Sequence, residues 1–171
     1  YLLSFNGARI VECDTGEILY QKLLSLTLLP GLYRFAKNNG CGLVTYLGSE
    51  VISAFPKDKY VELEAAINGL PVREVDGFLE FVDFDINKCL MTAEPEKAEK
   101  LEKELQQQYG DRASIYRSEP YFIEIMPENV NKAAGLEKLL PVLGVTRENT
   151  VCCGDGFNDI SSLAAEGNKF F

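Results

Sequence analysis

The chain has 171 residues, of which 46% are hydrophobic and 25% are charged, and its formal net charge is −9. This composition is typical of a folded globular protein and argues against a disordered chain. The acidic balance argues against nucleic acid or an anionic membrane surface as a partner, because both would repel the chain.

The sequence shows no sign of a membrane span or a secretion signal. No apolar stretch approaches the roughly 18 residues that a span needs. The N-terminus also lacks the basic-then-apolar order of a signal peptide. A cytoplasmic protein is the simplest interpretation, with no membrane among its partners.

Five cysteines and the lack of histidine limit the chemistry that the chain could perform. The cysteines are scattered and include no C-x-x-C pair, which predicts buried reduced thiols rather than a disulfide framework or a zinc site. Without histidine, Ser-His and Cys-His nucleophiles are excluded, so any catalysis must use carboxylates and lysines. The five are Cys13, Cys41, Cys89, Cys152 and Cys153.

The first part of the chain predicts two strands, a helix and a further strand. Alternating apolar residues flank Asp14-Thr15-Gly16, which indicates two strands joined by a turn. Pro30 suits the first turn of a helix that Gly40 would end, and residues 42–47 follow as a strand. Because the chain opens inside an apolar run and without Met, we expect it to begin in the middle of a protein.

The middle of the chain predicts two helices among antiparallel strands. The first helix would run from residue 61 to Ile67 and end at Asn68-Gly69, and the second, at residues 92–110, has the clearest helical spacing of apolar residues. Predicted strands occupy residues 77–85, 86–93, 113–118 and 121–127.

The C-terminal part has the pattern of a parallel α/β sheet. Residues 132–144 predict a helix that Pro141 should kink or shorten. The apolar run of residues 151–153 predicts a strand buried on both faces, and a second helix starts near Ile160. Ligands of open parallel sheets bind at the carboxyl ends of the strands, which is where Asp155 lies.

Asp155 and Asp159 could form a metal site after this strand. Glycines on both sides of Asp155 let the backbone turn and approach a ligand, and two hard oxygen donors suit Mg²⁺. The alternative is a turn at Asp155 and a helix cap at Asp159. Lys132, at the start of the preceding helix, could neutralise a phosphoryl group in the same crevice, although an exposed surface lysine is the simpler interpretation of any single lysine.

A calcium loop is a weaker alternative in the middle of the chain. Asp83, Asp85, Asn87 and Glu94 have the spacing of EF-hand positions one, three, five and twelve. The glycine expected at position six is replaced by Lys88, and the flanks read as strands rather than helices. We therefore favour a hairpin turn.

Two segments resemble a known superfamily. Residues 131–163, NKAAGLEKLLPVLGVTRENTVCCGDGFNDISSL, resemble the third and fourth motifs of the haloacid dehalogenase superfamily. Together with residues 4–24, SFNGARIVECDTGEILYQKLL, they resemble its Cof-type phosphatases. The resemblance implies an α/β fold: a partial Rossmann-like core, residues 1–25 and 127–171, with an inserted α/β (α+β) cap domain, residues 26–126. It also implies Mg²⁺-dependent hydrolysis of a small phosphorylated metabolite, such as a sugar phosphate, through an aspartyl-phosphate.

The resemblance implies a role for each matching residue. Lys132 would steady the nucleophile and the phosphate, and Asp155 would be a Mg²⁺ ligand. Asp159 and Asn158 would support the metal, its waters or the phosphate, and Asn6 is a candidate for the substrate pocket. The group also commonly has a lysine in a cap strand, where this chain has residue 88.

The sequence departs from the superfamily at its N-terminal motifs. No D-x-D stretch, which would supply the nucleophile and the general acid/base, precedes Asn6, and the phosphate-binding Ser/Thr motif is also missing. We therefore expect the metal and lysine half of a site, without turnover by this chain alone. Two other interpretations stay open: a non-catalytic binding or regulatory fragment, and a phosphotransferase-like or P-type pump domain of the same superfamily.

Overall fold

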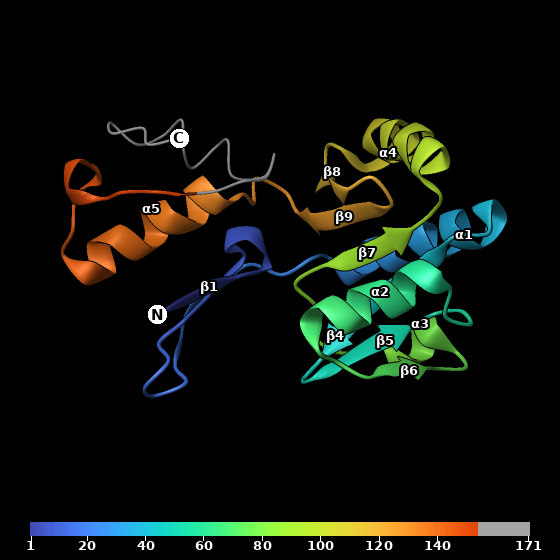
Figure 1. Cartoon of the computed structure of the whole chain (residues 1–171), viewed down its shortest axis with the longest axis horizontal. Helices are drawn as coiled ribbons and strands as arrows, with labels where there is room; N and C mark the ends of the chain where they lie inside the picture. Colours follow the sequence, from blue (N-terminus) through green and yellow to red (C-terminus); the bar gives the residue numbers. More distant parts are fainter. Residues whose placement is uncertain (154–171) are drawn as a thin grey trace. The chain divides into compact units, whose positions relative to one another are not determined.

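The structure, a computed structural model, describes residues 1–153 (Figure 1). It divides into two compact units, each described here by itself: Tyr1–Lys22 with Asn129–Phe171, and Leu23–Glu128. In the described part of the chain, no helix is long and apolar enough to cross a membrane. Both units combine helices with sheet, so the predicted α/β class is confirmed.

The first unit contains a three-stranded antiparallel sheet in the order β1-β2-β3. The strands are β1 (Leu2–Ser4), β2 (Arg9–Val11) and β3 (Ile18–Gln21). The predicted turn between β2 and β3 is confirmed. The single strand expected before it is interrupted by the 3₁₀ turn η1 (Phe5–Gly7), whose residues have φ values of 50°, 51° and 95°, which a strand does not allow.

Helix α5 (Lys132–Leu143) forms the other main element of the first unit. The side chain of Asn131 caps it by accepting a hydrogen bond from the Ala134 amide at 2.8 Å, and Gly144 ends it in the left-handed conformation. Pro141 does not end the helix, which continues to Leu143. At this position proline lies in the last turn, where only one internal hydrogen bond is lost.

The strand predicted at residues 151–153 is not formed. Cys152 makes an isolated bridge only, after the short turn η3 (Arg147–Asn149), and Val151 is 60% exposed. A parallel strand is buried only when other strands and helices cover it, and residues 1–153 include no such layer over this segment. The helix predicted from Ile160 lies beyond the described residues.

The second unit is built on a six-stranded sheet in the order β6-β5-β4-β7-β9-β8. Neighbouring strands are antiparallel, except for β5 and β6, which are parallel. The strands are β4 (Gly42–Leu47), β5 (Glu50–Ser53), β6 (Val72–Glu74), β7 (Cys89–Thr92), β8 (Ala113–Glu119) and β9 (Phe122–Pro127).

Helices cover both faces of this sheet. They are α1 (Leu29–Asn39), preceded by η2 (Leu26–Leu28), α2 (Lys59–Asn68), α3 (Phe78–Phe81) and α4 (Pro95–Tyr109). Side chains alternate between the faces, because successive residues of a strand point to opposite sides. Leu43 packs with the α1 and α4 residues in one apolar cluster, whereas Val44 packs with Val61 and Ala65 of α2 in another.

Most predicted elements of the second unit are confirmed. Gly40 and Gly69 end α1 and α2 in the left-handed conformation. The strand predicted at residues 77–85 is wrong, since this segment contains α3. Phe78, Leu79 and Phe81 all pack against one cluster. A helical turn can direct all three to one side, whereas a strand would send Phe78 to the opposite face.

Helix α4 protects the outer edge of β8. The Glu102 carboxylate accepts hydrogen bonds from the Arg117 amide at 3.0 Å and from its Nε at 2.8 Å. The Gln106 side chain donates to the Ile115 carbonyl at 2.8 Å. Side chains therefore satisfy edge groups that could otherwise pair with another strand.

The five cysteines are free thiols, but only Cys41 and Cys89 are buried. Burial raises the pKa of the Cys89 thiol to about 12, so it stays protonated at neutral pH. Cys13 and Cys153 are exposed, which corrects the expectation of buried thiols throughout. Cys13 lies in the turn between β2 and β3, where no core can cover it.

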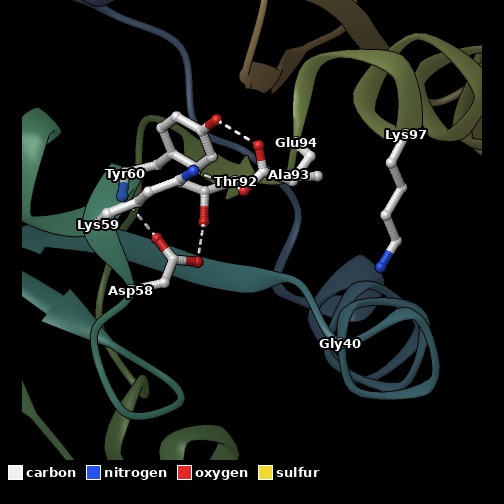
Figure 2. A pocket seen from close by; sticks show the side chains of 8 residues that line it. All are labelled: Gly40, Asp58, Lys59, Tyr60, Thr92, Ala93, Glu94 and Lys97. Carbon is white, nitrogen blue, oxygen red and sulfur yellow. Dashed lines mark hydrogen bonds and ion pairs between the residues drawn. The ribbon is translucent and has the colours of Figure 1, made fainter.

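Asp58 ties helix α2 to strand β7 (Figure 2). Its Oδ1 caps the helix by accepting from the amides of Tyr60 and Val61, at 2.8 and 2.9 Å. Its Oδ2 accepts from the Thr92 hydroxyl at 2.7 Å. A Cβ at residue 42 would approach this Oδ2 to 3.0 Å and also meet the Thr92 hydroxyl, which explains glycine there.

Replacing Asp58 by alanine should lower the free energy of unfolding. Loss of the cap costs about 1–2 kcal/mol, and the unpaired hydroxyl of the fully buried Thr92 adds about 1 kcal/mol. The measurement is urea denaturation, with Asp111→Ala as control, since Asp111 is exposed and pairs at the surface with Arg112 at 3.5 Å. Equal stability of the two variants would contradict the assigned role.

Candidate functional site

The start of helix α5 is the best candidate for an anion site in the described chain. Lys132 is its first residue, and its first turn contains no acidic side chain. The amides at the start of a twelve-residue helix carry partial positive charge, which adds to that of the ammonium. This end of α5 therefore combines two features that stabilise a phosphate group.

The structure brings the turn with Asn6 to the same helix. Residues of η1 contact α5, and the carbonyl of Asn131 lies 2.5 Å from where a Cβ on Gly7 would stand. Asn6 and Lys132, far apart in the sequence, thus belong to neighbouring segments of the first unit. Sequence reasoning named both residues but missed the contact between their segments.

The three remaining candidate residues, Asp155, Asn158 and Asp159, follow the last described residue. The predicted Mg²⁺ site at Asp155 and Asp159 therefore stays a prediction. Within residues 1–153, no group of three or more acidic or cysteine side chains gathers as metal ligands would. The lysine and Asn6 are the parts of the predicted site that the structure places.

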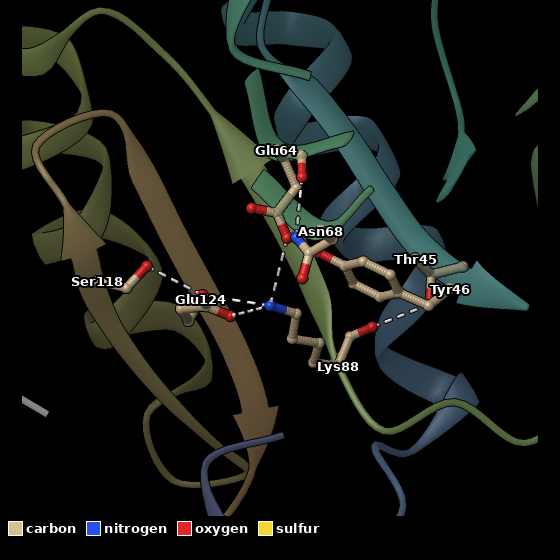
Figure 3. A network of polar contacts seen from close by, with 7 residues as sticks. All are labelled: Thr45, Tyr46, Glu64, Asn68, Lys88, Ser118 and Glu124. Carbon is tan, nitrogen blue, oxygen red and sulfur yellow. Dashed lines mark hydrogen bonds and ion pairs between the residues drawn. The ribbon is translucent and has the colours of Figure 1, made fainter. Parts of the chain in front are cut away.

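Lys88 is at the position where the resemblance implies a lysine in a cap strand. It lies in a buried ion network of the second unit (Figure 3). Its ammonium is 3.0 Å from the carboxylate of Glu124 and 3.8 Å from that of Glu64. The three side chains are only 13%, 7% and 8% exposed. Lys88, just before β7, thus holds two buried carboxylates, Glu64 of α2 and Glu124 of β9.

Hydroxyl groups complete this network. Ser118 donates to Glu124 at 2.9 Å, and the Tyr46 hydroxyl donates to Glu64. Burial and the Glu64 charge raise the pKa of Tyr46, so its hydroxyl stays protonated and remains a donor. The Lys88 ammonium also lies 4.9 Å from the centre of the Tyr46 ring. These contacts give Lys88 a structural role within the second unit.

The calcium alternative does not fit the structure. Positions seven to ten of the proposed loop form strand β7, so the segment cannot fold around one ion. Glu94, at position twelve, instead binds Lys59 at 2.6 Å and the Tyr60 hydroxyl at 2.7 Å. Lys88, at position six, belongs to the buried network.

A cavity of about 470 Å³ lies near the starts of α2 and α4 (Figure 2). Its charged groups are already paired: Lys59 with Glu94, and Lys97 with the carbonyl of Asn39. The Lys59 hydrogen bond lowers the pKa of Glu94, which therefore stays ionised. Its lining residues are Gly40, Asp58, Lys59, Tyr60, Thr92, Ala93, Glu94 and Lys97.

Comparison with known proteins identifies the family. The sequence profile of the haloacid dehalogenase-like hydrolases matches residues 1–170. The chain belongs to this hydrolase family. The resemblance of its motifs to the haloacid dehalogenase superfamily and its Cof-type phosphatases is thereby confirmed.

Solved structures of haloacid dehalogenase-like hydrolases share the fold. One from Bacteroides thetaiotaomicron is 35% identical, with a TM-score of 0.89 over 96% of this chain and 62% of its own. A subclass IIB sugar phosphatase, at 19% identity, has a TM-score of 0.78 over 96% of this chain and 60% of its own. The HMP-PP phosphatase of Cronobacter sakazakii is 26% identical over 98% of this chain.

The chain matches only part of the length of its relatives. The chain spans 60 to 62% of the length of the curated proteins that align with nearly all of it. The chain contains Lys132 and, at residues 154–159, the stretch GDGFND, which the sequence predicts to be motifs of the family.

Replacing Lys88 by methionine should strongly destabilise the second unit. The change leaves Glu64 and Glu124 buried without a cation, which costs about 3–5 kcal/mol. Lys103→Met is the matched control: Lys103 is 65% exposed and pairs with Glu99 on the surface, so the change should cost less than about 1 kcal/mol. Chemical denaturation measures both, and a loss at Lys88 as small as at Lys103 would show that the network contributes little.

Proposed function

We propose that the protein containing this chain is a Mg²⁺-dependent phosphatase that releases phosphate from a small phosphorylated metabolite, such as a sugar phosphate. The observation that carries the proposal is Lys132 at the positive end of α5, in a chain of the haloacid dehalogenase-like family. The phosphatases among its relatives support this choice.

Lys132 would act on the phosphate group directly. Its ammonium is a compact charge that can contact phosphate oxygens, and the amides at the start of α5 would add to the attraction. Hydrolysis of a phosphate ester redistributes negative charge over these oxygens. A cation held in place before the reaction stabilises that charge without reorganising, which lowers the barrier.

Asp155 and Asp159 would hold Mg²⁺, with Asn158 supporting the metal, its waters or the phosphate. Their chemistry fits the ion, since Mg²⁺ favours one or two carboxylates and completes its shell with waters and substrate phosphate. The bound metal would supply further positive charge to the phosphate. The roles of both aspartates are inferred from the sequence, because the structure describes residues 1–153 only.

We assign the two units different tasks. The first unit would be part of the catalytic core, and the second, Leu23–Glu128, would be an inserted cap that selects the substrate. The net charge of −9 favours a small-molecule substrate over nucleic acid or a membrane surface. A cytoplasmic location is part of this proposal.

The attacking carboxylate would come from outside these 171 residues. The family mechanism uses an aspartate that becomes phosphorylated, and no D-x-D precedes Asn6. We therefore assign turnover to the longer natural protein and none to the chain alone. A non-catalytic binding or regulatory fragment is the alternative, and so is a pump-like phosphotransferase. A D-x-D-G-T stretch in the reading frame before Tyr1 would favour the phosphatase.

In the longer protein, Lys132→Ala and Asp155→Asn should each lower kcat/KM for an aryl phosphate by about 100-fold or more, because each removes charge that stabilises the transition state. Lys138→Ala is the control, since Lys138 is exposed on the same helix α5. Release of inorganic phosphate with and without Mg²⁺ measures the effect. Full activity of Asp155→Asn would refute its role.

The purified 171-residue chain should not hydrolyse the same phosphate ester, because its nucleophile is missing. The measurement is phosphate release with Mg²⁺, run beside the longer protein as positive control. Mg²⁺-dependent turnover by the chain alone would show that another of its carboxylates attacks. A panel of phosphorylated metabolites on the longer protein would then identify the substrate.

A further inference from the structure

Gly135 occupies an unusual position for a glycine. It is buried in the first half of α5, four residues after the cap Asn131, and its amide donates to the Asn131 carbonyl at 3.1 Å. Glycine within a helix is destabilising relative to alanine, because it loses more conformational freedom on folding. Its presence here therefore calls for a steric reason.

The steric reason is a close backbone contact with Gly7. A Cβ on Gly135 would stand 2.5 Å from the Gly7 Cα and 3.0 Å from the Gly7 carbonyl oxygen. In return, a Cβ on Gly7 would stand 2.5 Å from the Asn131 carbonyl oxygen. These neighbours are backbone atoms, which cannot rotate away as a side chain could, so only glycine fits on both sides.

The turn held by this contact is strained. Phe5 and Asn6 have φ values of 50° and 51°, which residues with side chains rarely adopt, and Gly7 follows at 95°. Ala8 closes the turn by donating to the Phe5 carbonyl at 2.9 Å. Such strain persists only where the surroundings hold it, and it occurs preferentially at functional sites.

The contact between the turn and α5 involves direct sequence neighbours of Asn6 and Lys132, the two candidate phosphate-binding residues of this unit. Gly7 directly follows Asn6, and Asn131, whose carbonyl faces Gly7, directly precedes Lys132. A shift of the turn against α5 would therefore change the spacing of Asn6 and Lys132. Two donors that act on one phosphate group must keep that spacing to within about 0.5 Å.

We propose that Gly7 and Gly135 are positioning residues that hold Asn6 beside Lys132, so that the amide of Asn6 and the ammonium of Lys132 bind the same phosphate group. The inference rests on the proposed phosphatase function. It adds Asn6 as a phosphate-binding partner of Lys132 and gives the physical reason for two glycines. A contact between backbones suits this task, because it has no rotamer freedom.

The test is Gly135→Ala in the longer protein. The methyl group forces the turn away from α5, which should lower kcat/KM for an aryl phosphate by about 100-fold and raise the inhibition constant of inorganic phosphate by about tenfold. Circular dichroism confirms folding. Gly144→Ala is the control: Gly144 ends the same helix at φ 65°, and a Cβ added there would meet no other residue within 4 Å, so this change should lower the melting temperature but leave catalysis unchanged.

A second variant decides the matter if Gly135→Ala does not fold. Asn6→Gly allows the left-handed backbone without strain and removes the side chain together with its amide. It should fold and raise both KM and the inhibition constant of phosphate by about tenfold. Wild-type values of both constants in this variant would overturn the proposal.

The outcomes separate this inference from the function on which it rests. A wild-type protein that hydrolyses no phosphate ester would refute the proposed function, and phosphate binding by calorimetry would then test the positioning alone. An active wild type with a folded Gly135→Ala variant of unchanged kcat/KM and phosphate inhibition would show that the glycine contact serves packing only.

Discussion

The backbone contact between Gly7 and Gly135 is the constraint on which the first unit depends. It joins two segments that are more than a hundred residues apart in the sequence. The residues between them in the sequence, Leu23–Glu128, form a separate unit. Because both contacting surfaces are backbone, the contact tolerates no added methyl group on either side. The contact thereby holds the strained turn η1 against the capped helix α5. Asn6 lies in this turn, and Lys132 is the first residue of this helix.

The second unit is stabilised by different means. Side chains alternate between two apolar clusters on the faces of its sheet, and the edge strand β8 is covered by polar side chains of α4. Between α2 and the sheet lies the buried network of Lys88, Glu64 and Glu124. Each charge of such a network loses its hydration on burial, which offsets much of the attraction between the charges.

Local signals in the sequence were sufficient for most elements of this fold. The helix ends predicted at Gly40 and Gly69 follow from the left-handed conformation that glycine adopts easily. The prediction of a strand at α3 was wrong, because a run of four apolar and polar residues fits either a strand or one helical turn. Only the packing of its side chains against the apolar cluster distinguishes the two. The strand predicted at residues 151–153 failed because burial on two faces depends on neighbours that local sequence does not contain.

The sequence by itself determined the family, the α/β class and the helix ends at Gly40 and Gly69, because these depend on residue type and spacing along the chain. The residues that it assigns to phosphate and metal stay predictions. The tertiary structure alone decided that the turn at Asn6 lies against the helix of Lys132, and that Lys88 is held by two carboxylates. Both are contacts between segments distant in sequence, and a glycine or a lysine has no local pattern that names its partner. Gly135 was the one available signal, since a glycine within a helix indicates that another backbone comes close.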